Sequence, residues 1–188
     1  GVQGGIARSA GPCMTMGTAS TMTSITEAMG LSLPGASSIP AADSGHKRMG
    51  ADVGRRIVEM VWEGLTPEKI VTEAAVRNGA VVGMASGCSS NSVVHLIAMA
   101  RRAGVDLTLD DLDALGREVP MICNVRPSGK DYLMEEFYLA GGLRALMVQL
   151  AEKLDLSAVT VTGKTLGEGI EGAKVYNEDQ IRPQTNPV

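Results

Sequence analysis

Residues 66–104 read TPEKIVTEAAVRNGAVVGMASGCSSNSVVHLIAMARRAG, and they hold the clearest indications of secondary structure in the chain. Thr66 is a favourable helix N-cap, because Pro67 fits the first helical position and Glu68 lies at the positive end of the helix dipole. We therefore expect a helix that starts at Pro67 and continues at least to Ala75.

Two interpretations are open for the apolar residues 80–85 within this stretch. They either extend the helix beyond Asn78-Gly79 or form a short buried strand, because a short apolar run does not distinguish the two. Residues 87–91 read as a loop. The next helix covers residues 92–103 and ends at Gly104.

Helical spacing of apolar residues also dominates the rest of the chain. It predicts helices over residues 18–29, 43–63, 108–117 and 132–154, with Gly141-Gly142 as a point where the last one can break. Short strands are expected at residues 119–125 and 159–162. The predicted fold class is a helix-rich α/β domain over residues 1–176, followed by a polar linker at 177–188.

The composition narrows the classes of function. Lys and Arg number 17 against 21 Asp and Glu, giving a net charge of −4 and a pI near 5.2, which disfavours a nucleic-acid surface. No run of 18 apolar residues is present, so no membrane span is expected. The three cysteines have no regular spacing and Gly1–Gly5 lack signal-peptide features. We therefore expect a cytoplasmic protein.

Cys13 lies in a glycine-rich loop directly before the expected helix 18–29. Backbone N–H groups and the dipole at a helix start favour a thiolate, and thiolates hold iron–sulfur clusters. The alternative is a small buried side chain, which is what most free cysteines are. One cysteine cannot hold a cluster, and Cys88 and Cys123 form no CxxC pair with it.

The remaining cysteines and the two histidines have structural interpretations. Cys88 belongs to a loop that could cradle an anion, but capping of the next helix by Ser90 or Asn91 is favoured. Cys123 lies in an apolar segment and is expected in the core. No metal-binding spacing includes either histidine, so both are expected at the surface or an interface: His46 and His95.

Two further patterns are rejected as sites. The acidic residues between 106 and 113 lack the glycine and terminal Glu of a calcium loop, and a solvated helix start explains them. Gly163-Lys164-Thr165 is not the end of a P-loop, because the position of its first glycine holds Ala158.

Several segments resemble the dihydroxy-acid and sugar-acid dehydratases. Residues 13–22, CMTMGTASTM, together with LSLPG at 31–35, are similar to the cysteine motif of that family. Residues 87–96, GCSSNSVVHL, are similar to its GGSTNAVxHL block. The other similar segments follow in the family's order and bring the resemblance to nearly the whole chain: 109–120, 127–135, 140–143 and 162–168.

The resemblance implies a hydro-lyase with an iron–sulfur cluster, typically [2Fe–2S], bound by three cysteines, of which Cys13 matches the third. An open iron site would act as a Lewis acid on the C3 hydroxyl of the substrate. The resemblance also implies Mg²⁺, bound partly by a carbamylated lysine, which holds the C2 hydroxyl and the carboxylate. A serine alkoxide would remove the C2 proton, and loss of water would give a 2-keto acid.

Family members are much longer than this chain. The resemblance places the first two cluster cysteines and the Mg²⁺ ligands before Gly1, and the base serine after Val188. We therefore expect the latter part of the family's N-terminal domain, with no catalytic residue of its own. The isolated chain should be inactive and retain neither cofactor. Its expected partners are the remaining segments of the same protein, in a homodimer or homotetramer.

The cysteine motif also bears on the substrate. CMTMGTASTM is closer to the pentonate and hexonate dehydratases than to the CGGMYTANTM of branched-chain biosynthetic members. We therefore expect a sugar acid that is converted to a 2-keto-3-deoxy acid. The alternatives are the dihydroxy-acid dehydratase of branched-chain amino-acid biosynthesis and, for the isolated chain, an inert structural or interaction domain.

Overall fold

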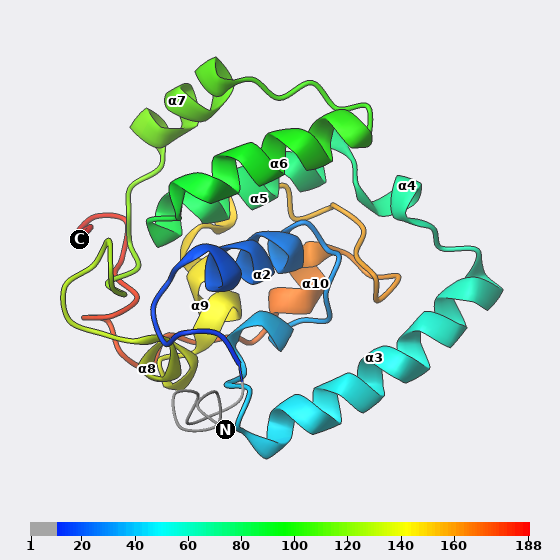
Figure 1. Ribbon diagram of the computed structural model, residues 1–188, viewed down its shortest axis with the longest axis horizontal. Helices are drawn as coiled ribbons and strands as arrows, with labels where there is room; N and C mark the ends of the chain where they lie inside the picture. Colours follow the sequence, from blue (N-terminus) through cyan, green and yellow to red (C-terminus); the bar gives the residue numbers. More distant parts are fainter. Residues whose placement is uncertain (1–10) are drawn as a thin grey trace, which may run out of the picture.

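Helices α2 and α5 form the centre of the structure, a computed structural model that describes residues 11–188 (Figure 1). Helix α2 covers Thr18–Ala28 and α5 covers Glu73–Ser86. The elements around them are η1 Ala36–Ser38, α3 Ser44–Glu63, α4 Pro67–Ile70, α6 Ser90–Arg102, α7 Leu109–Glu118, α8 Met134–Leu139, α9 Gly142–Gln149, η2 Ala151–Lys153 and α10 Leu166–Ile170.

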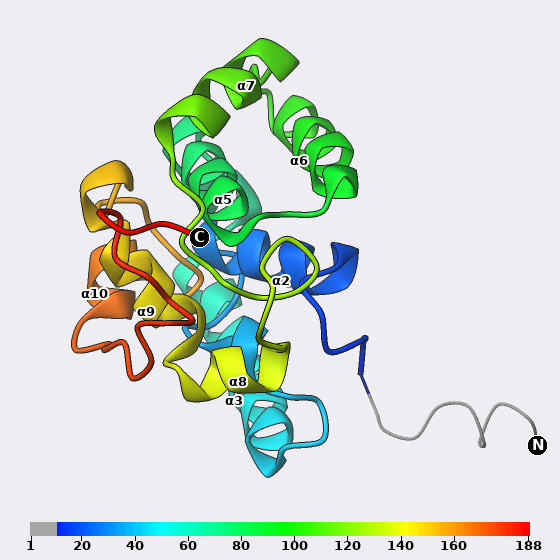
Figure 2. The same cartoon turned by 90° about the vertical axis from the view of Figure 1, so that its left-hand side faces the viewer.

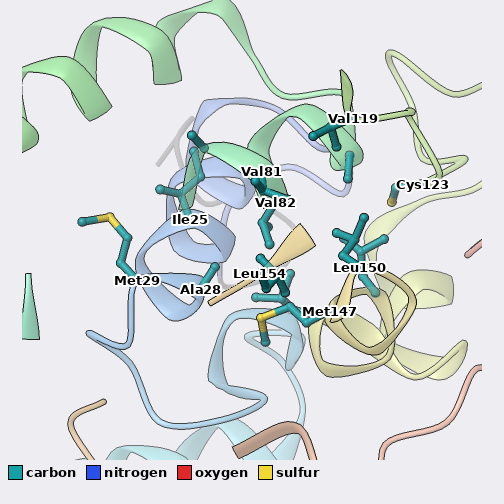
Figure 3. Close-up of a cluster of buried hydrophobic side chains, with 14 of the residues drawn as sticks. Ile25, Ala28, Met29, Val81, Val82, Val119, Cys123, Met147, Leu150 and Leu154 are labelled. Carbon is teal, nitrogen blue, oxygen red and sulfur yellow. The ribbon is translucent and has the colours of Figure 1, made fainter. Parts of the chain in front are cut away.

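The close approach of α2 and α5 depends on Gly79. A Cβ at this position would lie 2.8 Å from Cγ of Met29 and 3.1 Å from Cγ2 of Ile25, so a larger residue would push the two helices apart. Figure 3 shows Ile25, Val81 and Val82 in the same apolar cluster as side chains of α9 and the segments after it. Full burial of such side chains contributes about 1.5–3 kcal/mol each, and this cluster holds α2 in place.

The α/β part of the predicted fold class is not confirmed. Within residues 11–188 the expected strands reduce to isolated bridges, Cys123 with Ile181, Val125 with Tyr132, and Val159 with Thr165. The segment 119–125 is extended, but its backbone groups bond to the end of a helix and to the segment after Asn177, with no regular strand formed. The N–H groups of Ile122 and Cys123 both donate to the carbonyl of Ala85, at 2.9 and 3.2 Å.

The helical predictions are confirmed with shifted boundaries. The open question at residues 80–85 is answered by α5, which passes through them as a buried helix. The helix expected from Pro67 to Ala75 is instead two helices, because the Thr72 side chain accepts a hydrogen bond from the N–H of Ala75 and starts α5. The break near Gly141-Gly142 occurs as expected between α8 and α9.

Helix α3 lies to one side of the other helices in Figure 1 and at the bottom of the view, beside α8, in Figure 2. Asp43 caps it by accepting from the N–H of Gly45 at 2.6 Å, and Gly64 ends it with φ of 62°. Its link to the body is Arg56, whose Nε donates to the carbonyl of Val161 at 2.6 Å, together with the buried Met60.

The segment 177–188 packs along residues 121–124. Gln180 and Ile181 are fully buried, and the N–H of Asn124 donates to the carbonyl of Gln180 at 2.8 Å. Its role as a link to another domain stays a prediction. None of the helices in the described part of the chain has the length and apolarity needed to span a bilayer.

Candidate functional site

Cys13 lies in an exposed loop four residues before the N-cap of α2. Its Sγ lies 3.2 Å from Oγ1 of Thr15. The hydroxyl of Thr15, followed by its backbone, lowers the pKa of the Cys13 thiol below its ordinary value. The geometry therefore favours an accessible thiolate, which is the form that binds metals.

Two residues that follow Cys13 fix its loop against distant parts of the chain. The N–H of Met134 donates to the carbonyl of Met14 at 2.8 Å, and the N–H of Met16 donates to the carbonyl of Arg126 at 2.7 Å. The Met16 side chain is buried in the core. Cys13 is thus held at the surface by backbone bonds to residues more than 100 positions away in sequence.

A cavity of about 350 Å³ opens beside this thiol. Its walls come from the cysteine loop, the first turns of α2, residues 36–42, the first turn of α3 and the start of α8. Besides Cys13, the polar side chains on these walls include Ser37, His46 and Glu135. We call this space the Cys13 cavity.

The buried carboxylate of Glu27 shapes one wall of the Cys13 cavity. Its two oxygens accept hydrogen bonds from the N–H of Gly35 at 2.6 Å and of Ser37 at 2.8 Å. Burial raises the pKa of Glu27, while the bonds from residues 35 and 37 and the charge of Arg144 oppose that rise. Glu27 therefore fixes the turn that carries Ser37 into the cavity wall.

The loop at residues 87–91 meets the start of α2. Oγ1 of Thr18 lies 3.1 Å from Oγ of Ser89 and accepts from Nδ2 of Asn91 at 2.8 Å. The Ser89 hydroxyl also accepts from the N–H of Asn91 and caps α6. The capping interpretation is therefore confirmed, but the cap is Ser89 instead of Ser90 or Asn91.

The other two cysteines are less exposed than Cys13. Cys88 is partly buried, and its N–H donates to the carbonyl of Gly83 at 3.1 Å. Cys123 is fully buried as expected, and burial raises the pKa of its thiol to about 12. Neither thiol lines the Cys13 cavity.

The structure also shows the role of the remaining candidates, which are the two histidines and the two patterns rejected as sites. Both histidines are exposed as expected, and of the two only His46 reaches the Cys13 cavity. Asp111 forms a capping box with Thr108 at the start of α7, and Thr165 forms one with Glu168 at the start of α10. Among residues 11–188 no three His, Cys, Asp or Glu side chains are grouped as metal ligands.

Two blocks of sequence about 70 residues apart therefore meet where α2 begins, beside an accessible cysteine. The sequence pattern of the dihydroxy-acid/6-phosphogluconate dehydratase N-terminal family matches residues 2–169. The chain belongs to this family. The similarity to dehydratases inferred from the motifs is thereby confirmed.

Individual dehydratases match over almost all of this N-terminal domain. A 6-deoxy-6-sulfo-D-gluconate dehydratase from Pseudomonas putida is 49% identical over 187 residues, which are 100% of this chain and 32% of that protein. The dihydroxy-acid dehydratase of Caldanaerobacter subterraneus is 44% identical over 179 residues, 94% of this chain and 32% of that protein. The chain thus spans about a third of the length of these relatives.

The sequence reasoning missed Glu27 in this dehydratase domain. Its signal was present, because Glu27 is the only charged residue in the eleven residues of α2 and precedes the turn-forming Pro34-Gly35. A lone carboxylate on a helix with a buried face must find donors. The identity of those donors depends on how the following turn folds back, which the sequence does not show.

Proposed function

We propose that this chain is part of a dehydratase that removes water from a sugar acid, and that Cys13 contributes one thiolate to its iron–sulfur cluster. The observation that carries the proposal is the exposed Cys13 thiol, held at a fixed point beside a cavity of about 350 Å³. Small-molecule sites of proteins have volumes of about 300–1,000 Å³.

The residues present fit one ligand of such a cluster. Cys13 is accessible, and its thiol pKa is lowered by a neighbouring hydroxyl. The described residues offer no group of three ligands, so the other cysteines would come from elsewhere in the intact protein. On this proposal the isolated chain is inactive and retains neither the cluster nor Mg²⁺.

When bound, an iron of the cluster would supply Lewis acidity to the leaving C3 hydroxyl, and Mg²⁺ would supply it to the C2 hydroxyl and carboxylate. The chain itself would position these groups. Thr15 stabilises the Cys13 thiolate through its hydroxyl, and Glu27 fixes the turn that carries Ser37. His46 and Glu135, which are exposed on the walls of the Cys13 cavity, offer polar groups to the hydroxyls of a substrate there.

A sugar acid is proposed as the substrate over an aliphatic dihydroxy acid. The relative at 49% identity is named for a sulfogluconate, whereas the dihydroxy-acid dehydratase quoted above is 44% identical. The polar side chains on the walls of the Cys13 cavity also favour a sugar acid over an aliphatic dihydroxy acid. Dehydration of 2,3-dihydroxyisovalerate, in branched-chain amino-acid biosynthesis, is the second candidate.

The test is to measure the formation of 2-keto acid by the intact protein after it has been loaded with the cluster and Mg²⁺. Arabinonate, xylonate, gluconate and 6-deoxy-6-sulfogluconate are compared with 2,3-dihydroxyisovalerate. A site that pairs substrate hydroxyls rejects an analogue lacking them by up to about 10⁴-fold in kcat/KM, so one sugar acid should be strongly preferred. A preference for dihydroxyisovalerate would reverse the substrate assignment, and no product from any of the compounds would contradict the dehydratase assignment.

A further inference from the structure

The hydrogen bonds of the Cys13 sulfur within residues 11–188 all lead to Thr15. Its Sγ lies 3.2 Å from Oγ1 of Thr15 and 4.0 Å from the carbonyl oxygen of the same residue. While Cys13 is a thiol, its S–H group can donate to either oxygen. A cysteine that binds a metal has lost this proton, so its sulfur can only accept. The hydroxyl of Thr15 is then the group that donates.

The Thr15 hydroxyl is available for this bond, whereas the hydroxyls next to it in the loop are occupied. Cys13 is the one hydrogen-bond partner of the Thr15 hydroxyl in the part of the chain that the structure describes. By contrast, the Ser20 hydroxyl donates to the Thr15 carbonyl at 3.1 Å, and Oγ1 of Thr18 pairs with Ser89. The sulfur thus has one dedicated donor.

The backbone around Thr15 holds this hydroxyl in place. The carbonyl of Thr15 is bound by Ser20, and the N–H of the next residue, Met16, donates to the carbonyl of Arg126 at 2.7 Å. A Cβ at Gly17 would lie 3.7 Å from Sγ of Cys13 and 3.9 Å from Oγ1 of Thr15. The sulfur and the hydroxyl therefore lie together against the backbone that leads into α2. Because threonine is β-branched, its side chain has few rotamers to leave this position.

Thr15 reaches the sulfur without lining the Cys13 cavity. The walls of this cavity include Cys13, Met14 and Ser20 from the same part of the chain, but Thr15 is not among them. A substrate in the Cys13 cavity would therefore touch the sulfur side of the pair and not the Thr15 side chain. Any effect of Thr15 on dehydration must pass through Cys13.

A hydrogen bond to a ligating sulfur changes the electronic properties of the metal that it binds. The donor withdraws electron density from the thiolate and stabilises the more negative, reduced form, which raises the reduction potential of an iron–sulfur cluster. A thiolate that gives less charge to the iron also leaves that iron a stronger Lewis acid. Both effects are absent if the donor is replaced by a methyl group.

We propose that Thr15 is a positioning residue of this dehydratase, whose hydroxyl donates to the Cys13 sulfur, raises the reduction potential of the cluster and strengthens the Lewis acid that acts on the leaving hydroxyl. This inference rests on the proposed function of Cys13 as a cluster ligand. Because Thr15 is not itself a ligand, its loss should leave the amount of bound cluster unchanged.

The test is a redox titration of the full-length protein, loaded with its cluster and followed by visible absorption. Thr15→Val keeps the shape of the side chain and removes the donor, so the equilibrium constant for reduction should fall about tenfold, which is about 59 mV for one electron. Thr15→Ser keeps the hydroxyl and should retain most of the parent value. Thr26→Val is the matched control, because Thr26 is also partly buried but donates to the carbonyl of Met22 within α2. It should leave the potential unchanged.

Steady-state kinetics of the same proteins give a second readout. In Thr15→Val, kcat should fall about tenfold, while KM stays at the parent value because Thr15 does not line the Cys13 cavity. A parent-like potential in Thr15→Val, a potential in Thr15→Ser as low as in Thr15→Val, or a raised KM with unchanged kcat would each overturn the inference.

The cluster content of Cys13→Ser separates this inference from the proposed function on which it rests. If Cys13→Ser loses the cluster and the potential of Thr15→Val is unmoved, only the role of Thr15 is overturned. If Cys13→Ser keeps its cluster, the proposed function of Cys13 fails, and the role of Thr15 fails with it.

Discussion

Replacement of Glu27 by glutamine tests whether this buried carboxylate holds the wall of the Cys13 cavity. In Glu27→Gln one oxygen still accepts from a backbone N–H, but the new NH₂ group faces the other, so either Gly35 or Ser37 loses its acceptor. A hydrogen bond to a charged group contributes about 1.5–3 kcal/mol, and relief of a buried charge offsets part of that loss. We expect a net loss of about 1–2 kcal/mol, which is about 5- to 30-fold.

Amide hydrogen exchange at residues 35 and 37 of the full-length protein measures this loss locally. Protection should fall by about 5- to 30-fold in Glu27→Gln at whichever of the two amides loses its acceptor. Glu168→Gln, at the exposed capping box of α10, is the control and should leave these two amides unchanged. Unchanged protection in Glu27→Gln would refute the assignment of Glu27 as the group that fixes this turn.

The same variant has a defined dependence on pH. Burial raises the pKa of Glu27 above its ordinary value of 4.5, so the native state binds a proton more readily than the opened state does. The stability that Glu27 contributes is therefore greatest below pH 4.5 and falls as the pH rises through the native pKa. Glu27→Gln should remove this slope from the protection of residues 35 and 37, and an identical slope in both proteins would contradict the raised pKa.

Further predictions concern the cysteines. Thr15→Val should raise the pKa of Cys13, because the Thr15 hydroxyl is the main group that lowers it, and the pH profile of Cys13 alkylation should move upward; an unmoved profile would contradict this. In the native protein without cluster, iodoacetamide should label Cys13 and spare Cys123, which is fully buried; equal labelling rates would show that the Cys123 site opens readily. Cys123→Ser should lower the free energy of unfolding by about 1–3 kcal/mol through a buried hydroxyl, and a melting temperature equal to that of the parent would count against a tightly packed Cys123. The isolated chain, reconstituted anaerobically, should hold far less than one cluster, and stoichiometric iron and sulfide would refute the need for outside ligands.

Local signals in the sequence predicted the helices well. Asp43 and Gly64 mark the ends of α3, and Thr108 marks the start of α7, because capping depends on residues within one turn of each other. The extended segment 119–125 could not be assigned correctly in the same way. Its apolar residues fit a buried strand, but the partners of its backbone are Ala85 and the segment after Asn177, which are distant in sequence.

In the candidate site, too, the local sequence predicted some features, and others depend on contacts between distant residues. The position of Cys13 before a helix was visible in the sequence, and the motif resemblance identified it as a candidate ligand. The contact of Thr18 with Ser89 and the bonds from Glu27 to residues 35 and 37 depend on tertiary folding. The apolar spacing of residues 43–63 predicted the helix α3, but it did not predict that most of the large apolar side chains of α3 face outward, since periodicity defines a face without stating what covers it.

Cluster content of the full-length protein with Cys13 replaced by serine tests the central proposal most directly. Parent, Cys13→Ser and Cys123→Ser proteins are purified anaerobically, and iron, sulfide and 2-keto acid formation are measured for each, with circular dichroism as the check on folding. We predict that Cys13→Ser keeps its fold but loses the cluster and the dehydration activity, because a serine oxygen is a poor ligand for this cluster, while Cys123→Ser retains both. A Cys13→Ser protein with full cluster content and activity, or equal cluster loss in the two variants, would contradict the assignment of Cys13 as a cluster ligand.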